Sequence, residues 1–369
     1  MDIKHFDKKT TSKLTIATLN DVHHDIVPGE FSNVVTSLDS LEFDLLVNLG
    51  DMMRPDLNVD SHYLAYITDL QSSTNHPLNK HYHIIGNHDL TKKDDPLGRD
   101  HFFKKYCSPV AGDNSYYTGQ PYGTIANSTY QCWGVEIGNL LLIGIGDDNA
   151  GDPPGGENGL GTGNENFRAS GHFTRAQWNL FKSFVESNTD KIILVFSHVG
   201  IKDTTIGTGY TEFEGALSEE AFYDSSPQDE MDSHTRGYVG MIENLRTNFH
   251  YGTGDSDESN EIKTWFETWG KYIDMFLSGH IHTKIGQQWA GRGRYVEKYG
   301  THFLVSGMGN SKLALLYNSQ LEVRSGMLEI KGNKMKIRTY VHKDPNSVIP
   351  QGYYTPEDFE ITLKRNFIK

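Results

Sequence analysis

The sequence predicts an α/β fold in which parallel strands alternate with helices. Short apolar segments, each closed by a turn-forming residue, are typical of strands buried on both faces. In the first half of the chain they alternate with segments whose apolar residues recur at helical spacing. Polar residues able to bind metals follow almost every one of the apolar segments. These three observations indicate βαβ units with a functional site at one edge of the sheet.

The first half of the chain supplies three strands and two helices. We predict strands over 14–19, 43–49 and 81–85, which end at the pairs Asn20-Asp21, Gly50-Asp51 and Gly86-Asn87. Helices are predicted between them, over 31–41 and 61–72. The order of these elements is that of a βαβαβ unit.

The second half reads as a hairpin over 134–145, a helix over 174–187 with Thr174 as N-cap, and a buried strand over 191–196. A helix over 261–272 and a strand over 274–277 follow. Further strands are expected over 301–305, 325–330 and 335–341, with a hairpin turn between the last two. We expect these last strands to form a second, antiparallel sheet.

The chain has 369 residues and a mass of 41.6 kDa, which exceeds the roughly 100 to 200 residues of a typical domain. No internal repeat or linker divides it. We therefore expect one domain over 1–369 with its core at about 14–345. Segments 146–171 and 201–260 are expected to be insertion loops, and 346–369 a C-terminal tail, because they lack clear periodicity.

Charge and hydropathy exclude several classes of function. The formal net charge of −14 repels polyanions, so duplex nucleic acid is not an expected partner. No apolar run is long enough to span a membrane, and no signal-peptide pattern follows the N-terminus, so a cytoplasmic protein is favoured. Cys107 and Cys132 allow one disulfide at most and exclude a thiolate zinc cluster.

Candidate metal ligands follow five of the predicted strands. In parallel sheets ligands bind beyond the carboxyl ends of the strands, so residues distant in sequence should converge there. The Gly-Asn-His-Asp block at 86–89 is the most specific signal, since this composition would produce it by chance only about 0.01 times. The residues in question are Asp21, His23, Asp51, Asn87, His88, His198, His280 and His282.

Carboxylate and amide oxygens combined with imidazole nitrogens suit Mn, Fe, Zn, Ni or Co rather than calcium or a thiolate-bound ion. Seven or eight ligands are too many for one ion. Two ions about 3.5 to 4 Å apart and bridged by a carboxylate would use them all, and such a pair serves in the hydrolysis of phosphate esters.

In their order, the blocks Asp-x-His, Gly-Asp, Gly-Asn-His-Asp, a strand-end His and Gly-His-x-His resemble the calcineurin-like metallophosphoesterases. The resemblance spans about residues 14–345. It implies a four-layer α/β/β/α sandwich of two mixed sheets, with a dinuclear metal site at the strand ends.

The resemblance also implies a role for each matching residue. Asp21, His23 and His282 would hold one ion, Asn87, His198 and His280 the other, and Asp51 would bridge both. A hydroxide held between the ions would attack phosphorus, because two cations lower the pKa of bound water. His88 would stay off the metals and would contact a phosphoryl oxygen or protonate the leaving group.

One position departs from the family pattern. Many relatives have a carboxylate three positions after the bridging Asp, where it can orient the catalytic His, whereas this chain has Arg54. Either Asp89 or a backbone carbonyl orients His88, or Arg54 contacts the phosphate. The candidate catalytic residues are therefore His88, Asp89 and Arg54.

The expected function is metal-dependent hydrolysis of a small-molecule phosphate ester. A phosphodiester, cyclic-nucleotide or nucleotide-like, is favoured because the insertion at 201–260 could cover an organic group on both sides of the phosphate. The alternatives are a phosphomonoesterase of acid or alkaline type and a non-catalytic, metal-stabilised scaffold or binding module. The scaffold is disfavoured because a purely structural metal site would not need His88.

Overall fold

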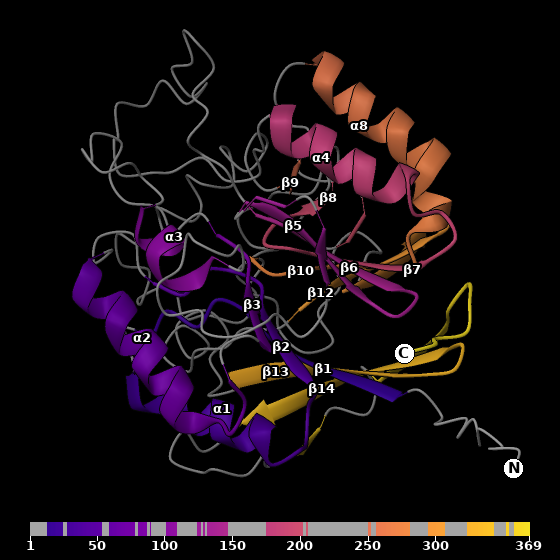
Figure 1. The fold of residues 1–369 in the computed structure, drawn as a ribbon. Helices are drawn as coiled ribbons and strands as arrows, with labels where there is room; N and C mark the ends of the chain where they lie inside the picture. Colours follow the sequence, from indigo (N-terminus) through magenta and orange to yellow (C-terminus); the bar gives the residue numbers. More distant parts are fainter. Residues whose placement is uncertain are drawn as a thin grey trace, which may run out of the picture.

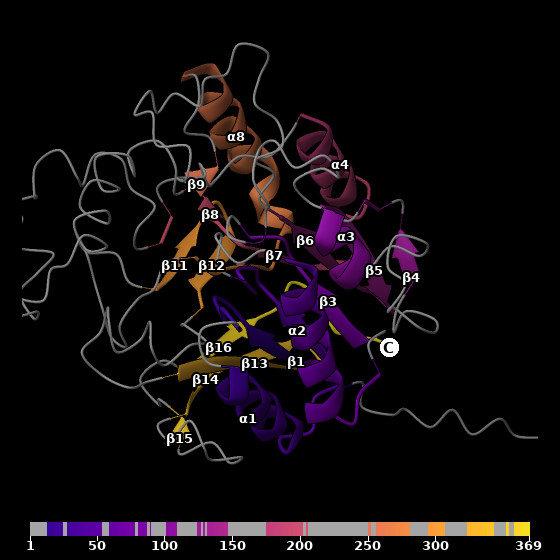
Figure 2. The ribbon, with the colours of Figure 1, turned by 90° about the vertical axis from the view of Figure 1, so that its left-hand side faces the viewer.

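Two β-sheets pack face to face at the centre of the computed structural model, and helices cover their outer faces (Figures 1 and 2). The structure describes residues 13–24, 28–53, 59–77, 80–86, 89, 101–108, 124–126, 128–129, 131–146, 175–201, 204–205, 250–251, 256–280, 294–306, 323–342, 352–353 and 358–369. This arrangement confirms the predicted four-layer α/β/β/α sandwich of two mixed sheets.

The first sheet begins with the predicted βαβαβ unit. Its elements are β1 (Lys13–Leu19), α1 (Pro28–Asp39), β2 (Leu45–Asn48), α2 (Asp60–Ser73) and β3 (His81–His83). The three strands are parallel, and Ala17 of β1 lies opposite Leu46 of β2. Parallel pairing requires a crossover, which the two helices supply on the outer face of the sheet.

The last strands of the chain complete this same sheet. They are β13 (Val323–Lys331), β14 (Lys334–His342), β15 (Gly352–Tyr353) and β16 (Phe359–Thr362), and β13 pairs antiparallel with β1. The prediction that the strands over 301–305, 325–330 and 335–341 form a second, antiparallel sheet is therefore wrong, because the last two belong to the sheet of β1 and the first pairs in parallel with a strand of the other sheet. The two-residue period of a strand shows which of its side chains share a face of the sheet, but it does not show which strand is its neighbour. β13 is buried along most of its length and pairs with a strand at each edge, β1 and β14.

The second sheet comes from the middle of the chain. Its order is β11-β12-β10-β7-β6-β5-β4. The strands are β4 (Thr124–Ala126), β5 (Cys132–Ile137), β6 (Leu140–Ile145), β7 (Ile192–Ser197), β10 (Met275–Ser278), β11 (Tyr295–Lys298) and β12 (Thr301–Val305). Strands β6, β7, β10 and β12 are parallel to one another, whereas β5 runs antiparallel to both β6 and β4, and β11 runs antiparallel to β12.

The other helices among the described residues are α3 (His101–Cys107), α4 (Arg175–Glu186) and α8 (Ser256–Trp269), which continues as a 3₁₀ turn, η5 (Gly270–Tyr272). Helices α4 and α8 lie together on the outer face of the second sheet (Figure 1). Helix α8 starts five residues before the predicted position, because its first turn is polar and apolar spacing begins only at Ile262.

Apolar side chains fill all three spaces between the four layers. Leu14 and Ile16 of β1 pack between the sheets, whereas Ala17 and Leu19 pack against α1 and α2. A third cluster lies between the second sheet and the helices α4 and α8. Burial on both faces explains why these strands read as continuous apolar runs.

Residues 358–369, within the segment interpreted as a tail, join the amino ends of the two sheets. The backbone N–H of Leu363 donates to Asn333 of the β13–β14 turn (2.8 Å). The N–H of Lys364 donates to Asp274 before β10 (2.7 Å), and that of Ile368 to Asn139 of the β5–β6 turn (2.8 Å). This C-terminal clasp lies at the end of the sheets opposite the predicted site.

Three further predictions concern the insertion loops, the cysteines and membrane-spanning segments. Segment 146–171 lies almost wholly outside the described part of the chain, and so does most of the insertion at 201–260. Cys107 and Cys132 are both buried free thiols. Among the described helices, none combines the length and the apolar composition that crossing a bilayer requires.

His81 on β3 is 1% exposed, and neither ring nitrogen has a hydrogen-bond partner among the described residues. Burial lowers the pKa of His81 to about 3, and the neighbouring His83 acts in the same direction. The folded protein therefore keeps this imidazole neutral at pH values where the unfolded chain takes up a proton.

We expect His81 to make the fold sensitive to acid. Below pH about 6.5 the unfolded chain binds the proton and the folded chain does not, so stability falls as pH falls toward 3, by on the order of 3 kcal/mol at pH 4. His81→Leu should remove most of this loss in urea unfolding at pH 7 and pH 4. His62→Leu, at a half-buried histidine of α2, is the control, and equal pH dependence in both variants would contradict the prediction.

Candidate metal centre

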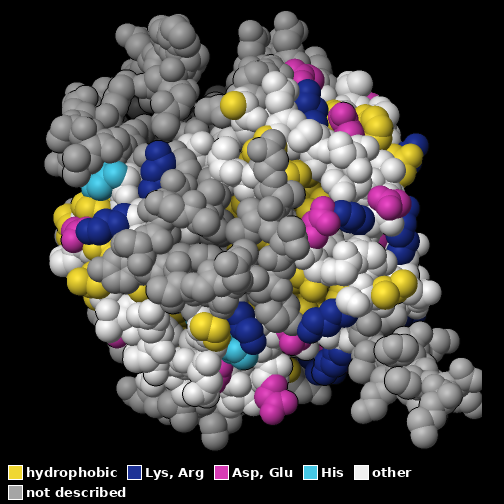
Figure 3. Space-filling view, viewed as in Figure 1, with side chains coloured by type: hydrophobic (Ala, Val, Ile, Leu, Met, Phe, Trp, Pro, Cys, Tyr) yellow, Lys and Arg dark blue, Asp and Glu magenta, His cyan; other side chains and the backbone are white. Residues whose placement is uncertain are grey.

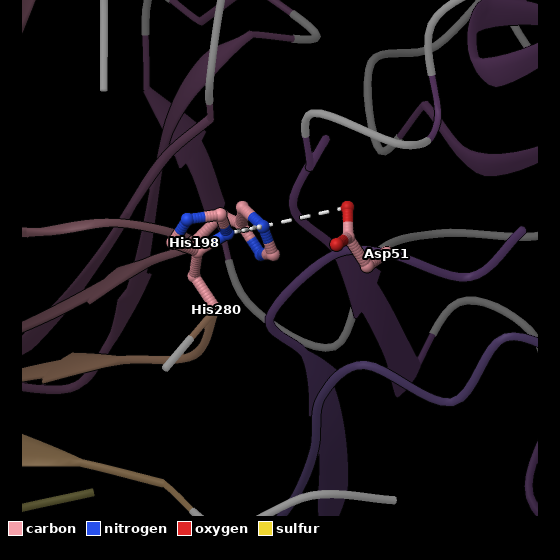
Figure 4. A group of neighbouring side chains, drawn as sticks. All are labelled: Asp51, His198 and His280. Carbon is pink, nitrogen blue, oxygen red and sulfur yellow. Dashed lines mark hydrogen bonds and ion pairs between the residues drawn. The ribbon is translucent and has the colours of Figure 1, made fainter. Parts of the chain in front are cut away.

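The carboxyl ends of four central strands meet where the two sheets face each other. Asp21 follows β1 and Asp51 follows β2 in the first sheet, while His198 follows β7 and His280 follows β10 in the second. All four side chains are at least nine-tenths buried. Figure 4 shows His198 and His280 approaching Asp51 from the second sheet.

Asp51 belongs to two groups of side chains that could each hold a metal ion. One group is Asp21, His23 and Asp51, the other is Asp51, His198 and His280, and in each the ligand atoms lie within 4.8 Å of one another. Oδ2 of Asp51 is 3.9 Å from Nε2 of His23, and Oδ1 is 3.4 Å from Nε2 of His198. Its two oxygens therefore face different groups, as a bridging carboxylate requires.

Backbone carbonyls orient two of the imidazoles. Nδ1 of His23 lies 3.0 Å from the oxygen of Met53, and Nδ1 of His198 lies 2.9 Å from the oxygen of Leu49. Because a carbonyl only accepts, Nδ1 carries the proton in both rings and Nε2 presents a lone pair toward Asp51. Nε2 of His198 also lies 3.0 Å from Nδ1 of His280. Two imidazole nitrogens this close can share a proton or a cation.

The backbone at these residues adopts an uncommon conformation. Asp21, His23, Asp51 and His280 have φ values of 50°, 38°, 55° and 65°, in the left-handed region. Only two other non-glycine residues of the described chain do so, Glu42 and Tyr299. Such conformations are unfavourable for residues with a Cβ and persist where the surrounding structure enforces them, often at functional sites.

Two glycines allow the loops to approach this closely. Gly50 has a φ of 104°, and a Cβ there would lie 2.8 Å from Nδ1 of His198. A Cβ on Gly86 would overlap Oδ1 of Asp51. The Gly-Asp and Gly-Asn pairs noticed in the sequence thus mark places where backbone, rather than side chain, packs against the candidate ligands.

Asp89 is fully buried beside Asp51, and its carboxylate accepts hydrogen bonds from backbone N–H groups. Burial and the negative charge of Asp51 raise the pKa of Asp89 to about 7, while the bonds from Gly86 and Met52 oppose the rise. A carboxylate with several N–H donors is stabilised in its charged form.

The structure brings together Asp21, His23, Asp51, His198 and His280, with Asp89 behind Asp51. Asn87, His88, His282 and Arg54 lie outside the described residues, so their roles stay predictions.

Two polar neighbours were missed by the sequence reasoning. The side-chain amide of Asn20 donates to Oδ2 of Asp21, and the amide oxygen of Asn48 accepts the N–H of Gly50 (3.2 Å). Both asparagines are fully buried at strand ends, directly before or near a candidate ligand. A polar residue at the end of an apolar run was the available signal. His24, which follows the candidate ligand His23 in the sequence, pairs instead with Asp69 of α2 (2.7 Å).

The donor set suits a pair of transition-metal ions. Imidazole nitrogens combined with carboxylate oxygens are the ligands that Mn, Fe, Zn, Ni and Co prefer. Buried carboxylates and histidines at such short distances are costly without cations or hydrogen bonds to compensate them. The observed groups therefore fit the predicted chemistry.

Known phosphoesterases are similar to this chain in sequence pattern or in fold. The sequence model described as calcineurin-like phosphoesterase matches residues 14–284. A dimetal phosphatase from Danio rerio has a similar fold, with a TM-score of 0.53, 11% identity, and coverage of 95% of this chain and 98% of that one. Purple acid phosphatase PPD1 from yellow lupin (Lupinus luteus) gives a TM-score of 0.48 at 13% identity, over 95% of this chain and 54% of that one. No curated protein sequence matches the chain.

Replacing the shared carboxylate should affect both metal groups. We expect the parent to bind two Mn per chain and Asp51→Asn to bind less than one, because one oxygen becomes an amide nitrogen that cannot ligate. Metal analysis after gel filtration measures the stoichiometry. Asp60→Asn, at a carboxylate paired with Lys105 on the surface, is the control. Two ions retained by Asp51→Asn would contradict the bridging assignment.

Proposed function

Because the chain belongs to the calcineurin-like phosphoesterase family, we propose that it hydrolyses a phosphate ester at a centre of two transition-metal ions. The observation that carries the proposal is Asp51, whose two oxygens face separate groups of candidate ligands. A single structural metal site would need only one of these groups. Two groups sharing one carboxylate are the arrangement that suits phosphoryl transfer.

Each residue has a proposed part in the reaction. Asp21 and His23, with His282, hold one ion, and His198 and His280, with Asn87, hold the other. When bound, the two ions would polarise the phosphoryl oxygens and lower the pKa of a water molecule toward neutrality. His88 protonates the leaving oxygen, and Arg54 contacts the phosphate.

We favour a phosphodiester of cyclic-nucleotide or nucleotide-like type over a monoester. The short strand β8 (Gly200–Ile201) begins two residues after His198 and pairs in parallel with β9 (His250–Tyr251). Ile201 and His250, the residues on either side of the segment 202–249, thus belong to a paired ribbon that starts two residues after His198. A segment of this length beside the phosphate is suited to contact an organic group that a bare phosphate monoester lacks.

Surface charge supports a small substrate. The protein carries a formal net charge of −14. On the face of the molecule that Figure 3 shows, acidic and basic side chains are interspersed among the described residues. An extended polyanion would be repelled by such a surface, whereas a small ester can be drawn to local cations. The proposed partner is therefore a small-molecule phosphate ester.

A substrate screen tests the proposed function. With added Mn, we expect hydrolysis of bis-p-nitrophenyl phosphate with a kcat/KM at least tenfold above that for p-nitrophenyl phosphate. The reverse preference would indicate a phosphomonoesterase, and two bound ions without hydrolysis of either ester would indicate a scaffold.

His88→Ala should retain both ions but slow the diester reaction by about 10² to 10⁴, the range of a positioned acid.

Replacement of the insertion tests the substrate class. A short Gly/Ser linker in place of 207–248 keeps β8, β9 and the buried Thr204 and Thr205. We expect parental metal binding and parental hydrolysis of the small aryl diester, with kcat/KM for 2′,3′-cyclic AMP and other nucleotide diesters reduced at least tenfold, because remote binding energy supports the chemical step. Equal losses on small and large esters would contradict a role in selectivity.

A further inference from the structure

Asp89 forms hydrogen bonds through all of its polar groups. Oδ2 accepts the backbone N–H of Asp51 (2.9 Å) and of Gly86 (2.8 Å). Oδ1 accepts the N–H of Met52 (2.8 Å) and of Met53 (3.2 Å). The four bonds occupy the roughly four lone-pair positions of a carboxylate, and the residue is 0% exposed. No acceptor position remains for a substrate proton.

The backbone of Asp89 is held as firmly as its side chain. Its N–H donates to the oxygen of Gly86 (3.1 Å), and its carbonyl accepts the hydroxyl of Tyr63 on α2 (2.9 Å). Tyr63 is itself fully buried. Asp89 is thus fixed to the helix layer while its side chain fixes the loop 51–53.

That loop in turn places the candidate ligands. The backbone carbonyl oxygen of Asp51 accepts a hydrogen bond from the N–H of His23 (3.1 Å). The backbone carbonyl oxygen of Met53 accepts one from Nδ1 of the same histidine (3.0 Å). Three successive N–H groups bound to one carboxylate fix the backbone from which the Asp51 side chain projects. They also fix the carbonyl that sets the tautomer of His23. Asp89 therefore acts on two of the three members of one ligand group, Asp51 and His23, without belonging to the group.

We propose that Asp89 is a positioning residue, whose buried carboxyl group organises the loop 51–53 around the metal centre through its bonds to backbone N–H groups and takes no part in proton transfer. This inference rests on the proposed metal centre, although not on the identity of the substrate. It differs from the role considered for Asp89 from the sequence, which was to orient His88.

Asp89→Asn is the direct test. The amide keeps one accepting oxygen, but its nitrogen would face two backbone N–H groups, and no rotation of the amide avoids this conflict. We expect the dissociation constant for Mn, measured by calorimetric titration of the metal-depleted full-length chain, to rise by about 10- to 100-fold, as when groups that orient ligands are changed. Saturating Mn should restore most of the turnover of the ester that the parent hydrolyses best.

Asp274 provides a matched control. It is 2% exposed, and its carboxylate accepts the backbone N–H of Ile193 (3.0 Å) and of Lys364 (2.7 Å) at the opposite end of the second sheet. Asp274→Asn makes the same chemical change in a similar environment. We expect it to lower the melting temperature and to leave Mn affinity within twofold of the parent.

Tyr63→Phe gives a milder version should Asp89→Asn fail to fold. It removes one hydrogen bond to Asp89 and should weaken Mn binding severalfold. Parental Mn affinity in both variants overturns the inference. So does a defect at saturating Mn that takes the form of a lost limb in the pH–rate profile, which indicates proton transfer.

The inference is also overturned if Asp274→Asn weakens Mn binding as much as Asp89→Asn, since the effect is then general instability. A parent chain that binds no ion overturns the metal centre and this inference together. A parent that binds two Mn but hydrolyses no ester rejects the proposed function alone, and the affinities of the variants still decide the role of Asp89.

Discussion

The hydrogen bond between Nδ1 of His198 and the carbonyl oxygen of Leu49 joins the two sheets at the point where their central strands end. It forms only because Gly50, next in the chain, has no side chain to separate them. The same bond aims Nε2 of His198 at Asp51, across the boundary between the sheets. A contact that joins the two sheets is therefore also one that positions His198 beside Asp51.

The site concentrates negative charge in a region with little access to water. Asp21, Asp51 and Asp89 are each at most 1% exposed, and backbone N–H groups donate to the carboxylates of Asp21 and Asp89. Any cation that binds the folded chain in preference to the unfolded chain stabilises it by mass action. Metal content and conformational stability should thus be linked in this protein, and metal binding would help to maintain the left-handed backbone at four candidate ligands.

Local features of the fold could be predicted from the sequence because burial on both faces leaves a continuous apolar run, as in β1 and β7. The site could be predicted because polar residues closed those runs at Asp21, Asp51 and His198. The neighbour of a strand could not, since β13 carries no local signal that it pairs with β1. The four hydrogen bonds to Asp89 could not be predicted either. Almost every residue has a backbone N–H donor, and only the folded loop brings these four together around one carboxylate.

The pairing of β1 with β13 has a consequence for how the protein is made. Ile16 lies opposite Leu328, about 300 residues further along the chain, so the amino-terminal strand leaves the ribosome long before its antiparallel partner exists. During that interval one edge of β1 is unpaired, which exposes backbone donors and acceptors to other chains. Bringing the two ends of so long a loop together costs conformational entropy before any contact between the strands forms. Folds whose contacting residues are far apart in sequence therefore fold slowly. Newly synthesised chains should accordingly depend on protection from aggregation until the last strands are released.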